Sequence, residues 1–522
     1  MGLTGSLYAG ISGLTSHSEA MAVIGNNLAN SSTIGFKRSS AQFEDIFYST
    51  ITTGGSSSQV GHGVSLASIY GDFSQGSYEA TSSSTDLAIG GNGFFMVNNP
   101  QDGTTYYTRA GNFIFNTDGS LVDANGYVVQ GWTASTNSKT GVTSAKGALG
   151  DIKLDSFQCD PSATKKMRLI TNLDSSSEDN TTDATDPYFA LLKTWDGQDE
   201  DPLADTAYAY QTTMTVYDEA GGSHDVTVYF DKVSNASGTS VWEYVVTCDP
   251  DEDGRTINGT ALKDTDAAGL LLSGTLTFDS TGRLTNMSAY TLSSSASGDM
   301  QDLSNWVPTE FNSSGYPVFT ANFSGSSNAS AVTSANAKNI ALDLGVNSDA
   351  AGGGWTGGVA NASLVGTDMT NLSKLTEPDA SATTTTSRDK DSSTQDQTQD
   401  GYSSGYLLGV TVSSDGVVTG SYSNGEAIDL FIVGLADFVN LQGLSREGNN
   451  LYAKTRDSGE PRIARAGESG MGTLASGELE QSNVDTATEM VDLITTQRGF
   501  QANSKVITTV DSLLAEVLQL KR

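Results

Sequence analysis

The sequence is poor in the residues that most often carry catalysis or bind metals. It contains two cysteines, Cys159 and Cys248, which are too few for a disulfide framework. Its three histidines, His17, His62 and His224, are scattered and form no HExxH motif or Cys/His cluster. We therefore expect no enzymatic activity, no cofactor and no metal centre built from these residue types.

Basic residues are also scarce, since 27 Lys and Arg stand against 61 Asp and Glu and give a formal charge of -34. Such a charge repels nucleic acid and anionic lipid. No apolar run is long enough to span a bilayer, and the first residues lack the basic and apolar regions of a secretory signal. We expect no nucleic-acid binding, no membrane insertion and, if the chain leaves the cytoplasm, no cleaved Sec signal.

The two ends of the chain carry apolar stripes with helical spacing. Their apolar residues recur at steps of three, four or seven, which is typical of an amphipathic helix. This predicts helices over Leu3–Leu28, roughly 40 Å long, and over Val484–Leu520, roughly 55 Å long. The stripe residues are Leu3, Leu7, Ile11, Leu14, Met21, Ile24 and Leu28 at the first end, and Val484, Val491, Ile494, Val506, Val510, Leu513, Val517 and Leu520 at the second.

Between the two ends the sequence is typical of β-structure. Apolar and polar residues alternate from about Val64, with hairpin signals such as Asp118-Gly119 and Asn125-Gly126. A centre rich in Ser, Thr, Asp and Gly follows, and Ser381–Gln399 is so polar that we expect a surface connection there. Strands of the first kind then resume at about Gly409.

This order predicts a mainly β fold with long terminal α-helices in a nested, multi-domain architecture: a helical coiled-coil base and stacked antiparallel β domains. The expected parts are a helical domain (1–32 and 479–522), a linker with short anchors (33–70), an inner β domain (71–147 and 395–478) and one or two inserted outer β domains (148–394).

Three local motifs could carry chemistry, and none of them has the context that its chemistry needs. Gly401–Gly405 matches GxSxG but leads into a strand-like run, where a nucleophile elbow needs a helix. Gly90–Gly93 could form a phosphate loop, yet no helix follows it. Asp249, Asp251 and Asp253 match the opening of a calcium loop, but Thr260 stands where the bidentate Glu belongs. We favour an acidic turn over a bound cation at this last motif.

The two cysteines each precede an Asp-Pro pair at the end of an expected strand. Cys159 and Cys248 could therefore lie close enough to form a disulfide, although two separate small core residues are the favoured interpretation.

Several motifs resemble those of the bacterial flagellar rod and hook proteins. At the first end these are Ser6–Leu14, Asn26–Asn30 and Thr33–Lys37, and at the far end Glu480–Asp485 and Gln497–Asn503. Asp86–Phe95 and Tyr107–Phe113 resemble the β domain that the family shares. Within the family, Met214–Asp218, His224–Phe230 and Gly416–Gly425 resemble segments of hook proteins, whereas distal rod proteins lack so large an insertion.

The resemblance implies a structural subunit of the flagellar hook, a curved and flexible homopolymeric tube that transmits torque from rod to filament. In such a tube both terminal helices line the export channel, so the stripe residues would be subunit contacts. The implied partners are other copies of the chain, the distal rod, hook cap and hook–filament junction proteins and the type III export apparatus, and the implied location is the extracellular hook. A distal rod protein and a secreted acidic adhesin or carbohydrate-binding β protein are the alternatives.

Overall fold

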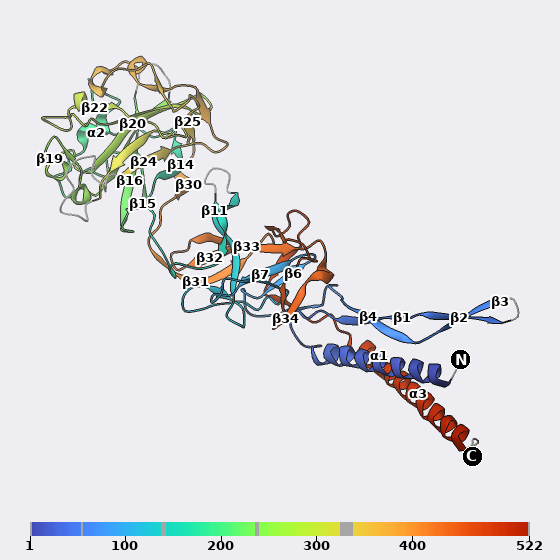
Figure 1. Cartoon of the computed structure of the whole chain (residues 1–522). Helices are drawn as coiled ribbons and strands as arrows, with labels where there is room; N and C mark the ends of the chain where they lie inside the picture. The colour runs from blue at the N-terminus through green and yellow to red at the C-terminus, as the bar shows by residue number, and fades with distance from the viewer. Residues whose placement is uncertain (1–2, 54–55, 137–141, 235–239, 324–337, 520–522) are drawn as a thin grey trace. The chain divides into compact units, whose positions relative to one another are not determined.

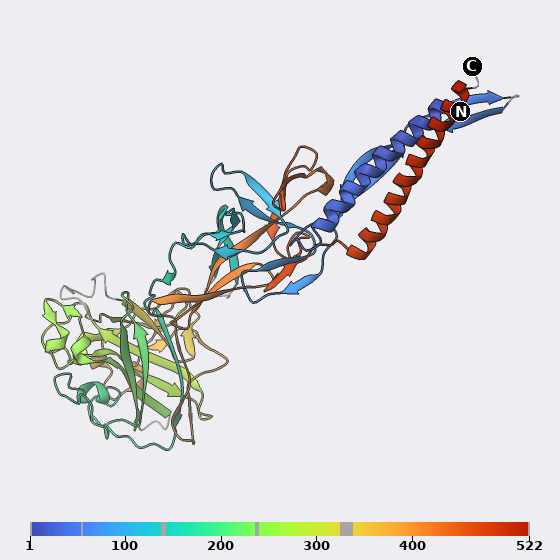
Figure 2. The same cartoon turned by 90° about the horizontal axis from the view of Figure 1, so that it is seen from below.

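The computed structural model describes residues 3–53, 56–136, 142–234, 240–323 and 338–519 (Figure 1). The chain forms two compact units. Unit 1 consists of Met1–Phe157 and Tyr406–Arg522, and unit 2 is Gln158–Gly405. Unit 1 therefore contains both chain ends, and unit 2 is one insertion whose two boundaries lie later in the chain than the expected 148 and 394. The fold class is confirmed, because β-strands dominate and a long helix stands at each end (Figure 2).

The two long helices of unit 1 agree closely with the apolar periodicity. Helix α1 spans Leu3–Ala29 and helix α3 spans Thr486–Gln519. A third, short helix, α2, lies in unit 2 over Ala190–Thr194. The predicted first helix is thus right to within one residue at its end, and the predicted second helix begins two residues too early.

The expectation of a linker over residues 33–70 is wrong. This stretch forms a two-stranded antiparallel ribbon in which β1 pairs with β4 and β2 with β3. Its Thr, Ile, Val and Tyr residues favour extended backbone, and this preference outweighs the low-complexity appearance of the Ser and Gly residues. The strands are β1 (Ser39–Asp45), β2 (Tyr48–Thr53), β3 (Ser56–Gly61) and β4 (Val64–Gly71).

The β domain of unit 1 is built from both halves of the chain. Strand β33 pairs with β32 and β36 from the same half, and also with β7 and β11 from the other half. Leu435 lies opposite Phe95, and Val433 lies opposite Gly131. Their apolar side chains form one core with Val97, Val129 and Leu474. The domain cannot close until the residues after the insertion have been added.

The strands of this domain, in chain order, are β5 (Tyr78–Ala80), β6 (Leu87–Gly90), β7 (Phe94–Asn98), β8 (Thr105–Thr108), β9 (Ile114–Phe115), β10 (Leu121–Val122), β11 (Val128–Thr136), β12 (Thr143–Asp151), β31 (Gly405–Val412), β32 (Val417–Tyr422), β33 (Ala427–Asp437), β34 (Ser445–Gly448), β35 (Leu451–Ala453), β36 (Arg462–Arg465), β37 (Thr473–Ser476) and β38 (Glu478–Glu480). Two further pairings, β37 with β6 and β38 with β5, also join the two halves.

Unit 2 contains a six-stranded sheet of antiparallel pairs. Its order is β15 (Tyr210–Tyr217), β16 (Ser223–Val233), β17 (Ser240–Cys248), β20 (Leu270–Phe278), β21 (Leu284–Leu292) and β22 (Trp306–Pro308). Every side chain from Val241 to Cys248 is buried. Successive side chains of a strand point to opposite faces, so the near-continuous apolar run of β17 indicates a sheet that is covered on both sides.

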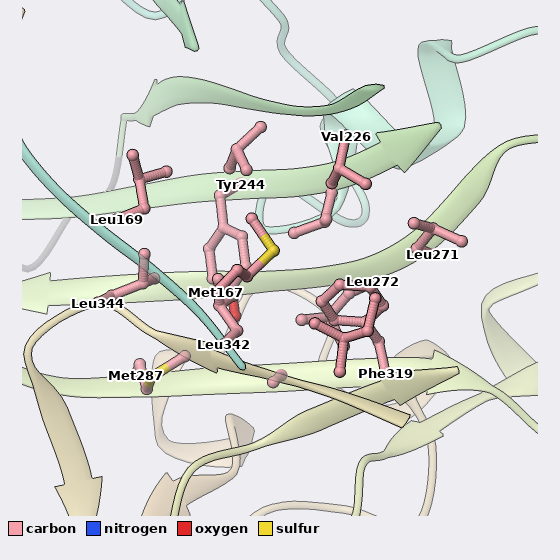
Figure 3. Close-up of a cluster of buried hydrophobic side chains, with 14 of the residues drawn as sticks. Met167, Leu169, Val226, Tyr244, Leu271, Leu272, Met287, Phe319, Leu342 and Leu344 are labelled. Atoms are coloured by element: carbon pink, nitrogen blue, oxygen red, sulfur yellow. The ribbon is translucent and has the colours of Figure 1, made fainter. Parts of the chain in front are cut away.

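The two faces of this sheet carry separate cores. On one face, Trp242 and Tyr244 join Met167, Leu169 and Leu342 of the second sheet (Figure 3). On the other face, a core of α2 and loop residues packs against the sheet. The members of that core include Phe189, Leu191, Trp195, Val241, Val245, Tyr290 and Trp306.

The second sheet of unit 2 has the order β23 (Val318–Ala321), β24 (Lys338–Asp343), β14 (Lys166–Asp174) and β29 (Thr386–Arg388), and β30 (Ser393–Gln399) also pairs with β14. The expected surface connection over Ser381–Gln399 is therefore wrong, since most of it is strand. Strand β14 is apolar and buried, so it supplies the core while β30 supplies backbone hydrogen bonds with exposed polar side chains.

The remaining strands of unit 2 are short. They are β13 (Gln158–Cys159), β18 (Thr256–Ile257), β19 (Thr260–Ala261), β25 (Val346–Ser348), β26 (Trp355–Thr356), β27 (Lys374–Leu375) and β28 (Pro378–Ala380). None of the helices in the described ranges is at once long and apolar enough to cross a membrane.

Candidate assembly surface

Helices α1 and α3 of unit 1 lie side by side and run in opposite directions (Figure 2). Gly10 lies against Ile507, Gly13 against Asn503, and the ring of His17 against Gly499. A Cβ atom at Gly13 would stand 2.7 Å from Nδ2 of Asn503. The seam between the helices thus depends on glycines that allow close approach, at some cost in helix propensity.

Although Ile507 lies in this seam, many large apolar side chains of the two helices remain on the outside. Tyr8 of α1 is 68% exposed, and Val491 and Val517 of α3 are 59% and 52% exposed. Met490, Phe500 and Ile11 are exposed as well. Several exposed large apolar side chains on one pair of helices are typical of a contact surface.

The predicted stripe residues therefore divide into groups. Val510 is buried, and Leu7, Leu14, Met21, Ile24, Leu28 and Val484 are half-buried. The exposed members are Ile11, Val491, Ile494, Val506, Leu513 and Val517. The side chain of Leu3 and the whole of Leu520 lie outside the described residues. The periodicity missed Tyr8, Met490 and Phe500, which stand beside the stripe and are exposed too.

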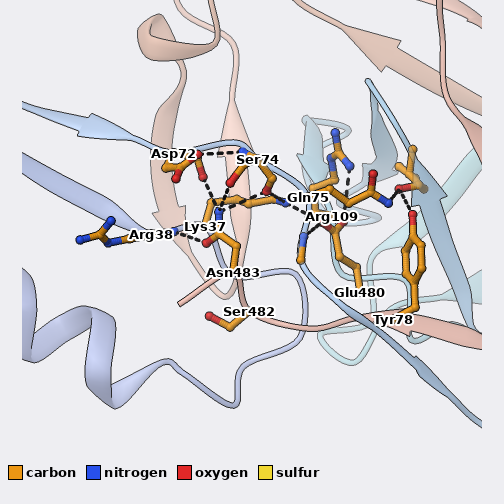
Figure 4. Close-up of polar contacts among 12 residues, drawn as sticks. Lys37, Arg38, Asp72, Ser74, Gln75, Tyr78, Arg109, Glu480, Ser482 and Asn483 are labelled. Carbon is orange, nitrogen blue, oxygen red and sulfur yellow. Dashed lines mark hydrogen bonds and ion pairs between the residues drawn. The ribbon is translucent and has the colours of Figure 1, made fainter. Parts of the chain in front are cut away.

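A cluster of buried ions joins the helical end of unit 1 to its β domain (Figure 4). The Nζ atom of Lys37 lies 2.6 Å from Oε1 of Glu480, and neither side chain is exposed. The guanidinium of Arg109 lies 3.3 Å from the other oxygen of Glu480. Lys37 also donates to the carbonyl of Ser74, and Arg109 donates to that of Gly91. We call Lys37, Arg109 and Glu480 the clasp.

The electrostatics of the clasp follow from its burial. Loss of water lowers the pKa of Lys37 and that of Arg109, and in each case the carboxylate of Glu480 opposes the shift. Glu480 also accepts a hydrogen bond from the backbone N–H of Gly76. One carboxylate thus stabilises two cations that have lost their water, so removing it would leave both of them buried and uncompensated.

A second set of contacts lies next to the clasp. The amide of Asn27 exchanges two hydrogen bonds with the backbone of Ser39 and donates a third to Glu489. Arg38 forms an ion pair with Glu489 and a longer one, of 3.3 Å, with Asp492. The end of α1, the start of the ribbon and the first turns of α3 are therefore held together by polar groups.

Sequence reasoning did not identify the clasp. Its three members stand in three motifs that look unrelated in the sequence, Thr33–Lys37, Tyr107–Phe113 and Glu480–Asp485. The available signal was weak: Lys37 and Arg109 are each the single charged residue of their motif, whereas Glu480 shares its motif with Asp485. Such residues are most often solvated, so only the fold could reveal that they meet.

The acidic motif in unit 2 forms a turn whose third carboxylate is already occupied. Asp249 caps a short 3₁₀ turn by accepting from the N–H of Asp251. Asp253 is buried and accepts from the guanidinium of Arg255, with donor–acceptor distances of 2.8 and 2.6 Å, and from Gly269. Asp253 is thus not free to complete a calcium loop.

The remaining motifs lie in strands and turns. Cys159 and Cys248 are both buried, and no disulfide joins them. Strand β31 begins at Gly405, so a strand follows the GxSxG match. Gly90–Gly93 connects β6 to β7, again without a helix.

Four families match consecutive parts of the chain. Residues 7–37 match "Flagella basal body rod protein", and residues 88–165 match "Flagellar hook protein FlgE/F/G D1 domain". Residues 172–402 match "Flagellar basal body protein FlaE D2 domain", and residues 475–520 match "Flagellar basal body rod FlgEFG protein C-terminal". The third match falls within unit 2, and the other three fall mostly or entirely within unit 1.

Full-length relatives agree with these matches. The chain is 31% identical to the flagellar hook protein FlgE of Treponema pallidum, and the alignment covers 99% of both chains. It is 30% identical to FlgE of Borreliella burgdorferi, again over 99% of both. A crystal structure of Helicobacter pylori FlgE2 covers 77% of this chain and all of its own, with a TM-score of 0.44 at 14% identity. On the full-length identity to these relatives, the chain belongs to the flagellar hook protein family.

Proposed function

We propose that the chain is the structural subunit of a bacterial flagellar hook and that it polymerises through the exposed apolar residues of α1 and α3. The observation that carries this proposal is that helix α3 leaves large apolar side chains exposed. Among them are Val491, Ile494, Val506, Leu513 and Val517. A helix of this kind is marginal in water, and contacts with neighbouring copies would bury its apolar side chains.

The assembly we propose is a curved tube that encloses the export channel and acts as a universal joint between rod and filament. The terminal helices would form its inner layer, and the β domains would lie outside and slide over small polar contacts. The strand-rich, hydroxyl-rich composition of unit 2 supports such contacts. The distal rod, hook cap and hook–filament junction proteins would contact the ends of the tube, and the type III apparatus would export the chain without a cleaved signal.

A triple variant of α3 tests the proposal: Val506→Ser, Leu513→Ser and Val517→Ser. Serine and valine have similar helix propensities, and the single Leu→Ser change costs only about 0.3 kcal/mol, so the monomer should keep nearly all of its helix content and stability. If each side chain contributes about 1 kcal/mol of burial between copies, the critical concentration for polymerisation should rise roughly 100-fold. Sedimentation gives this concentration, and electron microscopy reports whether the tubes are curved.

Thr495→Ser, Thr508→Ser and Ala515→Ser together form the matched control, because they change three exposed positions of the same helix without removing a large apolar side chain. This variant should polymerise like the parent chain. Normal polymerisation of the Val506, Leu513 and Val517 variant would refute the proposed surface, and straight tubes from the parent chain would favour a distal rod protein instead.

A further inference from the structure

Unit 2 carries a basic cleft, which is unexpected in a chain with a net charge of -34. The cleft has a volume of about 650 Å³ and is lined by Arg283, Arg388 and Lys390, and Asp389 is the only carboxylate among the described residues of its lining. All three cations are exposed, and none of them forms an ion pair with another described residue. Asp389 lies beside them, and the charge of Arg283 acts on Asp279. Three neighbouring exposed cations outside any ion pair of the described residues are nevertheless available to a ligand.

The cleft has a defined structure. Arg283 lies in the turn between β20 and β21, and an isolated bridge joins it to Thr386. The N–H of Ser387 donates to the carbonyl of Gly282 over 2.9 Å, so the loop that carries Arg388 and Lys390 is held against this turn. The hydroxyls of Ser381, Thr383 and Thr384 complete the lining. Guanidinium groups beside hydroxyl donors are suited to carboxylates.

A groove of the opposite charge lies toward the other end of the same sheet. It has a volume of about 700 Å³, and within the described part of the chain Lys263 is the only cation that lines it. Its carboxylates are those of Asp199, Glu200, Asp225, Asp249 and Asp251. All five are exposed, and none of them forms an ion pair among the residues that the structure describes.

The strand register shows that the cleft and the groove lie near opposite ends of strand β17. Ser240, at the start of β17, lies opposite Phe278, which precedes the turn of Arg283. Cys248, at the end of β17, lies opposite Val226, next to Asp225 of the groove. The nine residues of β17 span about 25 Å. The two charged sites of one unit 2 are therefore too far apart to neutralise each other.

We infer that the basic cleft of one unit 2 binds the acidic groove of unit 2 in a second copy of the chain, in a head-to-tail contact. When two copies join through two different surfaces, one copy still has a free basic cleft and the other a free acidic groove. Further copies can therefore add at both ends, and the contact extends into a chain instead of closing as a symmetric dimer. Charged, solvated surfaces of this kind guide association and register more than they add affinity. The inference rests on the proposed self-assembly and assigns one of its contacts to named residues.

Charge reversal tests the contact in the full chain. The basic-end variant carries Arg283→Glu, Arg388→Glu and Lys390→Glu, and the acidic-end variant carries Asp199→Lys, Asp249→Lys and Asp251→Lys. Each variant alone should raise the critical concentration about tenfold at low salt, because three solvated pairs are replaced by repulsion. An equimolar mixture should polymerise like the parent chain, because each variant then offers the charge that the other needs.

Lys263→Glu is the control, since it reverses one charge in the same direction as each basic-end substitution but leaves the groove acidic, and it should leave polymerisation unimpaired. Zero-length carbodiimide coupling gives a second measurement. In polymers it should join Lys390 to a carboxylate of the groove, and this cross-link should be missing from dilute monomer. If polymers of the parent chain lack this cross-link and both charge-reversal variants polymerise normally, the inference is overturned while the proposed function stands. A parent chain that forms no polymer would overturn the proposed function as well.

Discussion

Unit 2 and the helix pair of unit 1 treat their large apolar side chains in opposite ways. In unit 2, Trp242, Tyr244 and Tyr290 are fully buried within the same chain, and Figure 3 shows Tyr244 in the core between the two sheets. In unit 1, helix α3 leaves Val491 and Leu513 exposed. Unit 2 thus satisfies its apolar surface by itself, whereas the helix pair leaves apolar surface that only another molecule can cover.

The buried ions differ between the units in a second way. The partners in the clasp of unit 1, Lys37 and Glu480, come from opposite ends of the chain. In unit 2, the buried pair Asp253 and Arg255 is separated by a single residue. A buried pair that joins distant segments fixes how those segments meet, and a local pair fixes only a turn. Damage to the clasp should therefore affect the whole of unit 1.

The largest expected effect comes from Glu480→Ala, which leaves Arg109 buried without its ion-pair partner and Lys37 with only the weaker influence of Asp72. It should destabilise unit 1 by about 3–5 kcal/mol and leave the unfolding of unit 2 unchanged. Denaturant unfolding followed by hydrogen exchange distinguishes the two units. Glu478→Ala, on the same strand but half-buried and without an ion pair among the described residues, should change little. Equal effects of the two substitutions would contradict the role of the clasp.

The converse effect is expected from Leu342→Ala in unit 2. This side chain is fully buried in the core between the sheets, so its truncation should cost about 3 kcal/mol through the cavity it leaves. The loss should appear only in the unfolding of unit 2, as measured by the same exchange experiment. Leu364→Ala provides the control, because Leu364 is exposed and its loss should change stability by less than about 0.5 kcal/mol. A simultaneous loss of unit 1 would disprove the independence of the two units.

A smaller effect concerns the buried carboxyl group of Glu243. Burial raises the pKa of Glu243, and the negative charges of Asp231 and Asp179 raise it further, although the N–H of Leu191 and the hydroxyl of Thr181 donate to it. The folded state therefore binds this proton more tightly than the unfolded chain does. The stabilisation from this tighter proton binding is fully present below the pKa of the carboxyl group in the unfolded chain, which is about 4.3. It is lost as the pH rises through the pKa of the same group in the folded state.

Glu243→Gln removes this ionisation, so the variant should melt about 2–4 °C higher than the parent chain at pH 8. No gain is expected at pH 4, where the parent carboxyl group is already protonated. Calorimetry of unit 2 unfolding across this pH range provides the measurement. Glu310→Gln, at an exposed position, should show no such dependence. A gain of the same size at both pH values would argue for better packing and against the titration.

The smallest effect is expected at Asp492, whose ion pair with Arg38 is partly exposed. Asp492→Asn should cost about 0.5 kcal/mol or less, and added salt should reduce the difference. Glu489→Gln, in the same helix, alters a buried acceptor of Arg38 and Asn27 and should cost more. Chemical denaturation at low and high salt compares the two variants. A larger loss from the Asp492 variant would reverse the ranking of the two contacts.

Sequence patterns predicted best where the structure depends on nearest neighbours along the chain. The periodicity of α1 and α3 and the turn signals Asp118-Gly119 and Asn125-Gly126 depend on local backbone preference, and the structure contains the helices and the turns. Composition predicted a linker where residues 39–71 form a ribbon, and a surface connection where β30 forms a strand. A polar strand resembles a loop in the sequence as long as the strand it pairs with is unknown. The clasp escaped notice because Glu480 is hundreds of residues away from Lys37 and Arg109 in the chain.

The sequence by itself determined the class of fold, the helical ends, the insertion of one unit into another and, through its motifs, the resemblance to flagellar rod and hook proteins. These properties are repeated along the chain or lie within short segments. Only the tertiary structure decided that Lys37, Arg109 and Glu480 meet, that glycines fill the helix seam, and that opposite charges gather toward opposite ends of the large sheet in unit 2. Each of these depends on strand order and side-chain direction, which long-range packing sets and local preference does not.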